Sequence, residues 1–430
     1  MPVLRPVPPG LKARLKDRVT SWGLAQAPLV FGILRRVWPI FPLPGGGRLA
    51  TLHDDVLQVF REDGGFGVPY RGKLDVIMGG HPFFLGLGEG AEYRRQTETL
   101  RKAVRPDDVP ALAATVEKRC GEILGASAGR IEVVDDLVRA VTFEVLGSYF
   151  GITDPPCASL SECATRLFEF QFADAGNDPS LRAEVDVFAP ALRAHIDDLI
   201  HARRNSGTFG NDVLGRLLVA QESDSYISDA MIRTWLMGLV VGGPPQPPMV
   251  VPQALEQLLR RPAALAGAQR AAEADDDAAL AGYVFEAMRF DPLGPALPRV
   301  ALEDCVLASG TRRATRIRKG ATVLAAFSSA MFDHNRVPDP RRFDPRRLPH
   351  EYIHFGHGLH TCFGLHINRI LLPLMLKGLL KRRGLRRAPG PEGRLSKRGL
   401  FADRLVVHFE PEPTDQARSR STSAQVELTP

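Results

Sequence analysis

Cysteine is scarce in this chain, and its distribution restricts the class of protein. The 430 residues include five cysteines, an odd number, scattered from Cys120 to Cys362. Such usage argues against a framework of disulfide bonds and favours a reducing compartment. We therefore expect a cytoplasmic protein held together by a hydrophobic core, for which a hydrophobic content of 44% is ample.

Long apolar runs are also missing near the start of the chain. The first ten residues lack the charged and then apolar pattern of a secretory signal. The most apolar early run, residues 25–34, is too short to span a bilayer and ends at Arg35 and Arg36. We therefore expect no membrane anchor.

A strong charge of one sign is absent as well, because the net charge is only +6. No recognised nucleic-acid-binding motif accompanies this mild excess, so we expect no nucleic-acid partner. The length alone is compatible with two or three domains. Because no internal linker supports a split, we predict one large domain over residues 1–410. Residues 411–430 are polar, have little to bury and are predicted to be a disordered tail.

The most informative stretch is residues 355–364, Phe-Gly-His-Gly-Leu-His-Thr-Cys-Phe-Gly. An apolar run with helical spacing follows over residues 365–380, so Cys362 lies at the mouth of a predicted helix. Unpaired N–H groups and the positive helix end favour a thiolate at that place. Gly356 and Gly358 allow backbone angles closed to other residues and leave room for a flat ligand. The stretch therefore predicts a thiolate beside a flat ligand.

This stretch resembles the haem-binding loop of the cytochromes P450, whose pattern is Phe-Gly-x-Gly-x-His/Arg-x-Cys-x-Gly. The resemblance implies that Cys362 is the axial thiolate of a b-type haem, iron protoporphyrin IX, and thiolate ligation favours O–O cleavage. No Cys-x-x-Cys-His sequence occurs, so a covalently attached haem is not expected. The residues that fill the fixed positions of the pattern, and would contact the cofactor, are Phe355, Gly356, Gly358, His360, Cys362 and Gly364.

The resemblance also implies a fold and further haem ligands. The fold is expected to be mainly α with small β-sheets, the cytochrome P450 fold. Arg299 follows Pro298 and matches the propionate-binding arginine of the family, with His360 as the second partner. A guanidinium suits the two carboxylates that haem carries.

One expected pair of propionate ligands is replaced in this chain. The family often has a histidine and, four residues on, an arginine on the helix that crosses the haem edge, predicted here over residues 92–104. Those two positions are Tyr93 and Thr97. The sequence leaves open which residue substitutes for them. The alternatives are Arg94, Arg95, Arg101 and His81.

A second constellation concerns support for the cysteine loop. Glu286 and Arg289 are three residues apart, on one face of a predicted helix. The family joins such a pair to an arginine from a Pro-x-Arg-Phe segment, which residues 340–343 supply through Arg342. The resemblance implies that these three residues form a structural network beneath the thiolate face of the haem. A carboxylate shared by two guanidiniums can be buried with its charge paired.

The central helix departs most from the family. Its members carry Ala/Gly-Gly-x-Asp/Glu-Thr there, and the acid and alcohol relay protons to dioxygen. In this chain Pro245 takes the acid position and Gln246 the alcohol position, and neither can relay protons in that way. Four prolines in five residues predict a broken helix that restarts near Pro247 or Pro248. The alternative is a proline-rich surface loop.

The resemblance implies haem-thiolate oxidation, of monooxygenase type, of a small apolar organic molecule, with a ferredoxin-type electron donor. The missing relay favours an alternative enzyme fed by peroxide, a peroxygenase or a hydroperoxide isomerase or dehydratase, in which Gln246 orients a peroxide oxygen. A second alternative is a haem protein that binds ligand without turnover. The basic segment 377–404 is either a solvated face or a docking surface for an acidic electron carrier.

Overall fold

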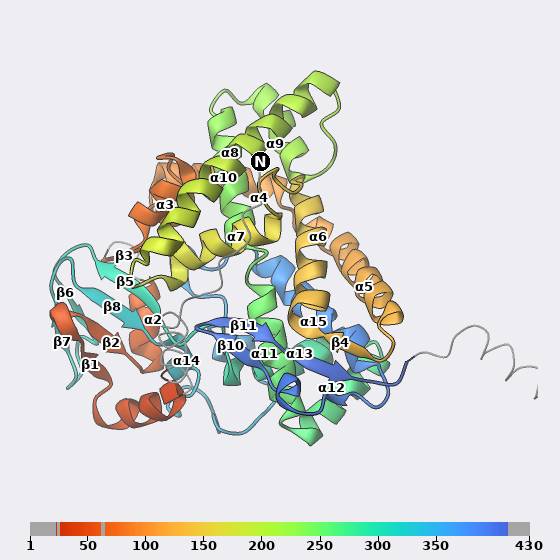
Figure 1. The fold of residues 1–430 in the computed structure, drawn as a ribbon. Helices are drawn as coiled ribbons and strands as arrows, with labels where there is room; N and C mark the ends of the chain where they lie inside the picture. Colours follow the sequence, from red (N-terminus) through yellow and green to blue (C-terminus); the bar gives the residue numbers. More distant parts are fainter. Residues whose placement is uncertain (1–22, 24–25, 62–64, 412–430) are drawn as a thin grey trace, which may run out of the picture.

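Helices fill most of the molecule, and the largest sheet lies on one side of it (Figure 1). This computed structural model describes residues 23, 26–61 and 65–411. The expected fold class, mainly α with small β-sheets, is confirmed. The predicted tail lies outside the described residues apart from Pro411.

The helices follow the apolar periodicity of the sequence. The helix predicted after the cysteine loop is α15, Leu365–Leu380, and the predicted crossing helix is α4, Ala91–Ala103. Within the described residues, no helix combines the length and apolar character that crossing a bilayer requires. The other helices are α2 His53–Arg61, α3 Arg71–Met78, α5 Val109–Ala126, α6 Ala140–Phe150, α7 Leu160–Phe168, α8 Pro179–Ser206, α9 Val213–Ser223, α10 Asp229–Gly242, α11 Pro247–Leu259, α12 Pro262–Glu273, α13 Asp277–Phe290 and α14 Phe327–Ala330.

The strands form small, mostly antiparallel sheets. The largest has the order β1-β2-β8-β5-β3, in which only the pairing of β2 with β8 is parallel. A three-stranded sheet has the order β4-β12-β9, and β6 pairs with β7 and β10 with β11. The strands are β1 Ile40–Pro42, β2 Arg48–Ala50, β3 Phe66–Gly67, β4 Arg130–Glu132, β5 Leu297–Ala301, β6 Cys305–Leu307, β7 Thr315–Ile317, β8 Thr322–Ala325, β9 Arg386–Arg387, β10 Ser396–Arg398, β11 Phe401–Arg404 and β12 Val406–His408.

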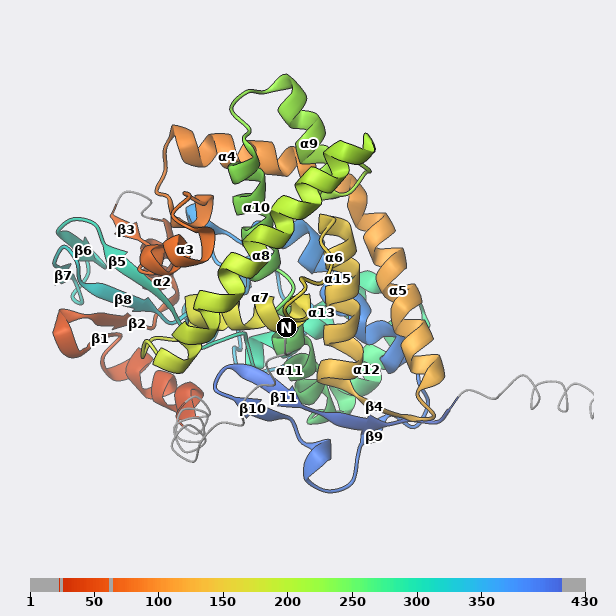
Figure 2. The same ribbon diagram turned by 45° about the horizontal axis from the view of Figure 1, so that its top comes forward.

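The main hydrophobic core lies among the helices. Helices α11, α13 and α15 pack against one another, and α5 packs along α15. Helix α8 crosses the molecule beside α10 and α7 (Figure 2). Almost every residue of α11 is buried, so this helix lies in the interior although it begins with two prolines. A smaller core lies between the five-stranded sheet and α2. The cysteine loop leads directly into α15.

Candidate active site

The cysteine loop is folded mainly by its own backbone. The amide of Cys362 donates to the carbonyl of Phe355 at 2.8 Å, and the amide of Thr361 donates to Gly358 O at 3.1 Å. Gly356 and Gly358 have φ values of 70° and 73°, which favour glycine. A Cβ atom on Gly358 would also lie 2.2 Å from the carbonyl oxygen of Phe60 in α2. Glycine is therefore required at this position by both the turn and the close approach of α2.

The Cys362 sulfur lies just before the first turn of α15, as the sequence predicts. Burial raises the pKa of this thiol, while the backbone N–H of Gly364 and the Asn368 amide lower it. Asn368 Nδ2 donates to the sulfur at 3.8 Å. Both donors would stabilise negative charge on sulfur, and a bound metal cation would supply the remaining compensation for burial. The sequence analysis did not single out Asn368, which lies six residues after Cys362 in the first turn of α15.

His360 and Arg299 come together from the loop and from β5. The side chain of Arg299 is 5% exposed, and its guanidinium lies over the ring of Phe60, 5.1 Å from the centroid. Burial and, to a smaller extent, the charge of Arg299 lower the pKa of His360 to about 4. His360 Nδ1 is buried and has no hydrogen-bond partner within the described residues. A buried ring nitrogen without a partner beside a buried arginine fits an anionic group such as a haem propionate.

Tyr93 ties the crossing helix α4 to the cysteine loop. Its hydroxyl donates to the carbonyl of Leu359 at 2.5 Å, and its ring meets the ring of His360 edge-on at 6.1 Å. Thr97 does not reach the loop, because its hydroxyl donates back to the carbonyl of Tyr93 at 2.9 Å. In place of the family's charged pair, α4 therefore presents a phenol that holds the residue before His360.

The four candidates to replace the missing propionate ligands all have exposed side chains. Arg94 pairs with Glu89 at 3.6 Å, and Arg95 pairs with Asp224 at 2.7 Å, with both arginines at the surface. His81 and Arg101 are exposed.

Replacing Tyr93 with phenylalanine should loosen the cysteine loop while leaving its packing unchanged. The variant keeps the ring and loses the hydrogen bond to Leu359, worth about 1 kcal/mol. We expect normal secondary structure and faster transfer of haem to apomyoglobin, by several-fold. The isosteric variant Thr97→Val is the control, because the Thr97 hydroxyl serves only its own helix. Equal haem-transfer rates for Tyr93→Phe and the parent chain would contradict this role.

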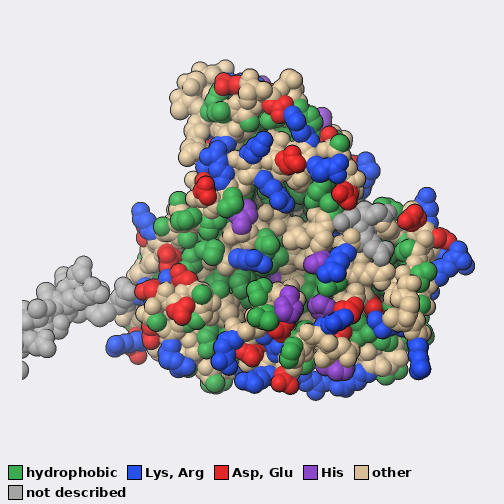
Figure 3. All heavy atoms as spheres, turned by 180° about the vertical axis from the view of Figure 1, so that it is seen from behind, with side chains coloured by type: hydrophobic (Ala, Val, Ile, Leu, Met, Phe, Trp, Pro, Cys, Tyr) green, Lys and Arg blue, Asp and Glu red, His purple; other side chains and the backbone are tan. Residues whose placement is uncertain are grey.

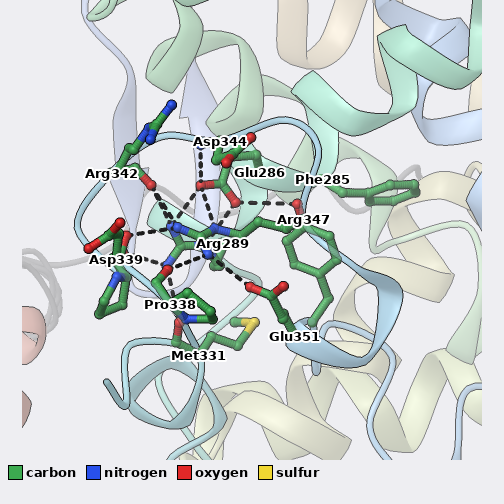
Figure 4. Close-up of polar contacts among 12 residues, drawn as sticks. Phe285, Glu286, Arg289, Met331, Pro338, Asp339, Arg342, Asp344, Arg347 and Glu351 are labelled. Atoms are coloured by element: carbon green, nitrogen blue, oxygen red, sulfur yellow. Dashed lines mark hydrogen bonds and ion pairs between the residues drawn. The ribbon is translucent and has the colours of Figure 1, made fainter. Parts of the chain in front are cut away.

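The predicted ion-pair network exists, with one member corrected. Glu286 and Arg289 are both 0% exposed and form two hydrogen bonds, of 2.7 and 2.8 Å (Figure 4). The prediction that the Arg342 side chain completes the network is wrong. Arg347 does so, donating from Nε to Glu286 Oε1 at 3.2 Å and from Nη1 to Glu351 at 2.8 Å. Arg342 contributes its backbone carbonyl, which accepts from Arg289 and from Arg347.

The path of the chain explains this correction. The side chain of Arg342 is exposed and points away from Glu286 (Figure 4). The turn after it brings the side chain of Arg347 back, so that it is only 4% exposed. The sequence does contain this arginine, five residues after the expected one, but the spacing does not reveal which side chain turns inward.

The network holds the segment that leads into the cysteine loop. The amide of Asp344 and the hydroxyl of Tyr352 both donate to the Glu286 carboxylate, at 2.9 and 3.3 Å. One ring nitrogen of His354 lies 2.9 Å from Phe285 O, and burial lowers the pKa of this histidine to about 4. A neutral His354 ring donates to that carbonyl, so α13 fixes the chain one residue before the loop begins.

The central helix is broken, as its prolines predict. Helix α10 ends at Gly242 and α11 begins at Pro247. Pro244 and Pro245 are buried, which excludes the alternative of a surface loop. The side-chain amide of Gln246 donates to the carbonyl of Gly242, which the break deprives of its helical partner. Gln246 Oε1 has no hydrogen bond within the described part of the chain, so it remains an acceptor.

An aromatic contact chain connects α10 with the residue after Cys362. Gly238 lies one turn before the break, and a Cβ atom there would be 2.1 Å from the ring of Phe83. The rings of Phe83 and Phe84 are 4.4 Å apart, and those of Phe84 and Phe363 are 5.3 Å apart. The central helix and the cysteine loop are thus separated by two phenylalanine rings at this point.

The basic segment 377–404 is largely neutralised within the chain. Lys377 is buried and lies within 3.0 Å of carboxylates on Glu117, Asp275 and Asp277. Arg387 and Lys397 pair with Glu256 and Asp291. These pairs favour a structural role over a docking surface for the residues concerned.

Comparisons with known proteins agree with this site. The family model for Cytochrome P450 matches residues 279–395, which contain the ion-pair network, Arg299 and the cysteine loop. The chain is 31% identical over 201 residues to the mycinamicin IV hydroxylase/epoxidase of Micromonospora griseorubida, covering 46% of this chain and 48% of that protein. It is 35% identical over 123 residues to a bifunctional dioxygenase–epoxy alcohol synthase of Pyricularia oryzae, covering 29% of this chain and 11% of that protein. The matches thus span about half of the first relative and a small part of the second.

The fold is shared over a much longer range. The structure of P450BioI, solved in complex with an acyl carrier protein ligated to hexadec-9Z-enoic acid, matches with a TM-score of 0.77. The match covers 91% of this chain and 100% of that chain at 19% identity. The fold and the cysteine loop together define a haem-thiolate protein. The chain has the cytochrome P450 fold, and its cysteine loop resembles that of the cytochrome P450 family.

Members of this family bind haem b, and the side chains described above fit that cofactor. Cys362 would supply the axial sulfur, and Arg299 and His360 would bind the propionates. The haem supplies the oxidising chemistry, while the residues of the chain position it, bury it and support its ligand loop.

Proposed function

We propose that this chain is a haem-thiolate oxidoreductase that oxidises a small apolar organic molecule by monooxygenase chemistry. The observation that carries this proposal is Cys362, which is half-buried just before α15 and receives donors from Gly364 and Asn368. Similarity to a hydroxylase/epoxidase supports the reaction class. We place the activity in one domain over residues 1–410, in the cytoplasm, where free thiols stay reduced.

Electron delivery by a ferredoxin-type protein fits the face of the molecule next to the cysteine loop. A groove of about 940 Å³ there is lined by parts of α2 and α13, by the loop and by the start of α15. Histidine and basic side chains gather near the middle of this face (Figure 3). Arg61, His357 and Arg369 line the groove, so an acidic carrier is the electrostatically favoured partner.

A peroxide-driven reaction is the second candidate, and the break in the central helix favours it. No side chain at Pro245 or Gln246 can deliver protons as the family's acid and alcohol do. In a peroxide or hydroperoxide the oxygen is already reduced to the peroxide level. Its reaction therefore needs fewer delivered protons than the activation of dioxygen does. Oε1 of Gln246 can accept a hydrogen bond from the O–H group of such a molecule and so orient it. Similarity to a protein named as a dioxygenase–epoxy alcohol synthase supports this route, because an epoxy alcohol has the composition of an unsaturated hydroperoxide.

Turnover measured under three conditions distinguishes these candidates. The haem-loaded chain would be supplied with an apolar test substrate and a reductase–ferredoxin system, with hydrogen peroxide or an organic hydroperoxide alone, or with neither. Product only with the electron donor supports the monooxygenase, and product with peroxide alone supports the second candidate. A shift of the haem absorption band on ligand addition, without product under any condition, would indicate a binding protein and refute both.

Gln246 gives a sharper test of the peroxide route. Gln246→Ala should reduce peroxide-driven turnover by roughly 100-fold if the amide positions the peroxide, the size typical of removing one aligned polar group. Gln246→Glu keeps the length and the acceptor but loses the bond to Gly242, and the acid it adds should raise coupling of reductant to product. Unchanged peroxide-driven turnover in Gln246→Ala, with tight coupling to reductant in the parent chain, would remove this role.

A further inference from the structure

An apolar row on the surface has no explanation in the haem site. Residues 26–37 form a helix at the edge of the molecule, beside β1 (Figure 1). Leu29, Ile33 and Val37, spaced at every fourth residue, are 65%, 55% and 77% exposed, and Val30 is 46% exposed. This spacing places all four on one side of the helix. Trp38 continues the row and is 53% exposed.

The opposite side of this helix fixes its orientation. Phe31 is buried against Leu49 of β2 and Ala326. Arg35 donates to the hydroxyl and the carbonyl of Ser329, at 2.8 and 3.1 Å. Because these contacts hold the inner side, the apolar row faces outward in the folded chain, and the helix cannot turn it into the core.

The sequence around the helix is basic. Arg36 is exposed on the same helix, next to the apolar row. The 22 residues at the start of the sequence contain one acidic residue, Asp17, and five basic residues. These are Arg5, Lys12, Arg14, Lys16 and Arg18.

We propose that the face formed by Leu29, Val30, Ile33, Val37 and Trp38 docks peripherally on an anionic phospholipid bilayer. An exposed apolar row flanked by cations is the combination that binds the interface of such a membrane, and tryptophan favours the level of the head groups. Each cation near an anionic surface adds attraction that salt screens. A second copy of the chain is disfavoured as the occupant, because it would bring two basic segments together. The docking is superficial and does not require a spanning helix.

The experiment is cosedimentation of the full-length, haem-loaded chain with vesicles. Vesicles of phosphatidylcholine mixed with phosphatidylglycerol are compared with vesicles of phosphatidylcholine alone. The test variant is Leu29→Ser/Ile33→Ser/Val37→Ser, which changes exposed side chains and should leave folding and haem content intact. The control variant is Val187→Ser/Val219→Ser/Leu348→Ser, whose side chains are 45%, 51% and 58% exposed at other sites.

We expect the parent chain and the control variant to sediment with the anionic vesicles, and salt to weaken their binding. The test variant should bind about tenfold more weakly or worse, because it loses three large apolar side chains. Replacing Lys12, Arg14, Lys16 and Arg18 by glutamine should also weaken binding to the anionic vesicles.

Several results would overturn the proposal. One is a parent chain that binds neither kind of vesicle. Another is a test variant that binds as tightly as the control. Stronger binding after deletion of residues 1–22 would show that this segment covers the helix. The parent chain and the control variant could instead run as dimers in gel filtration while the test variant runs as a monomer. That result would assign the face to a second copy of the chain.

Discussion

Replacing Cys362 with alanine is expected to abolish the carbon monoxide band of the reduced protein that is characteristic of the family. The alanine side chain cannot ligate iron, so most of the haem should also be lost on desalting. The fold of the loop should survive, because the amide of residue 362 still donates to Phe355 and the glycine turns are unchanged. The measurements are the absorption spectrum, haem content and far-ultraviolet circular dichroism.

Two further variants keep this test decisive. Cys305→Ala removes a half-buried cysteine on β6 and should leave the band unchanged. Cys362→His offers a nitrogen ligand, and we expect bound haem without the thiolate band. If the band persisted in Cys362→Ala, another group would have to be the axial ligand.

The second large effect is expected at the buried network. Glu286→Ala leaves the guanidiniums of Arg289 and Arg347 without their shared acceptor, and both are buried. Removing one partner of such a buried ion pair lowers the free energy of unfolding by about 3–5 kcal/mol. We expect a lower midpoint of unfolding in urea and poor haem retention, because Asp344 and Tyr352 also lose their link to α13.

The chain contains a matched pair of arginines that tests the corrected network. Arg347→Ala should resemble Glu286→Ala, because its side chain contacts Glu286 and Glu351. Arg342→Ala should change stability by less than about 0.5 kcal/mol, since its side chain is exposed and its carbonyl remains. A larger loss from Arg342→Ala than from Arg347→Ala would restore the original prediction.

The sequence by itself determined the features that depend on local stereochemistry. The glycines of the cysteine loop permit its positive φ angles, and the apolar period after Gly364 specifies α15. The prolines after Gly243 end α10, because proline lacks an amide donor and clashes with the preceding turn. Pro247 then starts α11, since its missing N–H is not needed in a first turn.

Only the tertiary structure decided which side chains meet. Arg347 reaches Glu286 because the turn after Arg342 reverses the chain, and this reversal has no signature in the spacing of the arginines. Tyr93 holds Leu359 because α4 crosses the loop at that point. Lys377 and Arg387 are paired because α5, α11 and α13 bring carboxylates to them. Local geometry follows from neighbouring residues, whereas partners far apart in the chain are chosen by how the helices pack, and a single sequence does not record that packing.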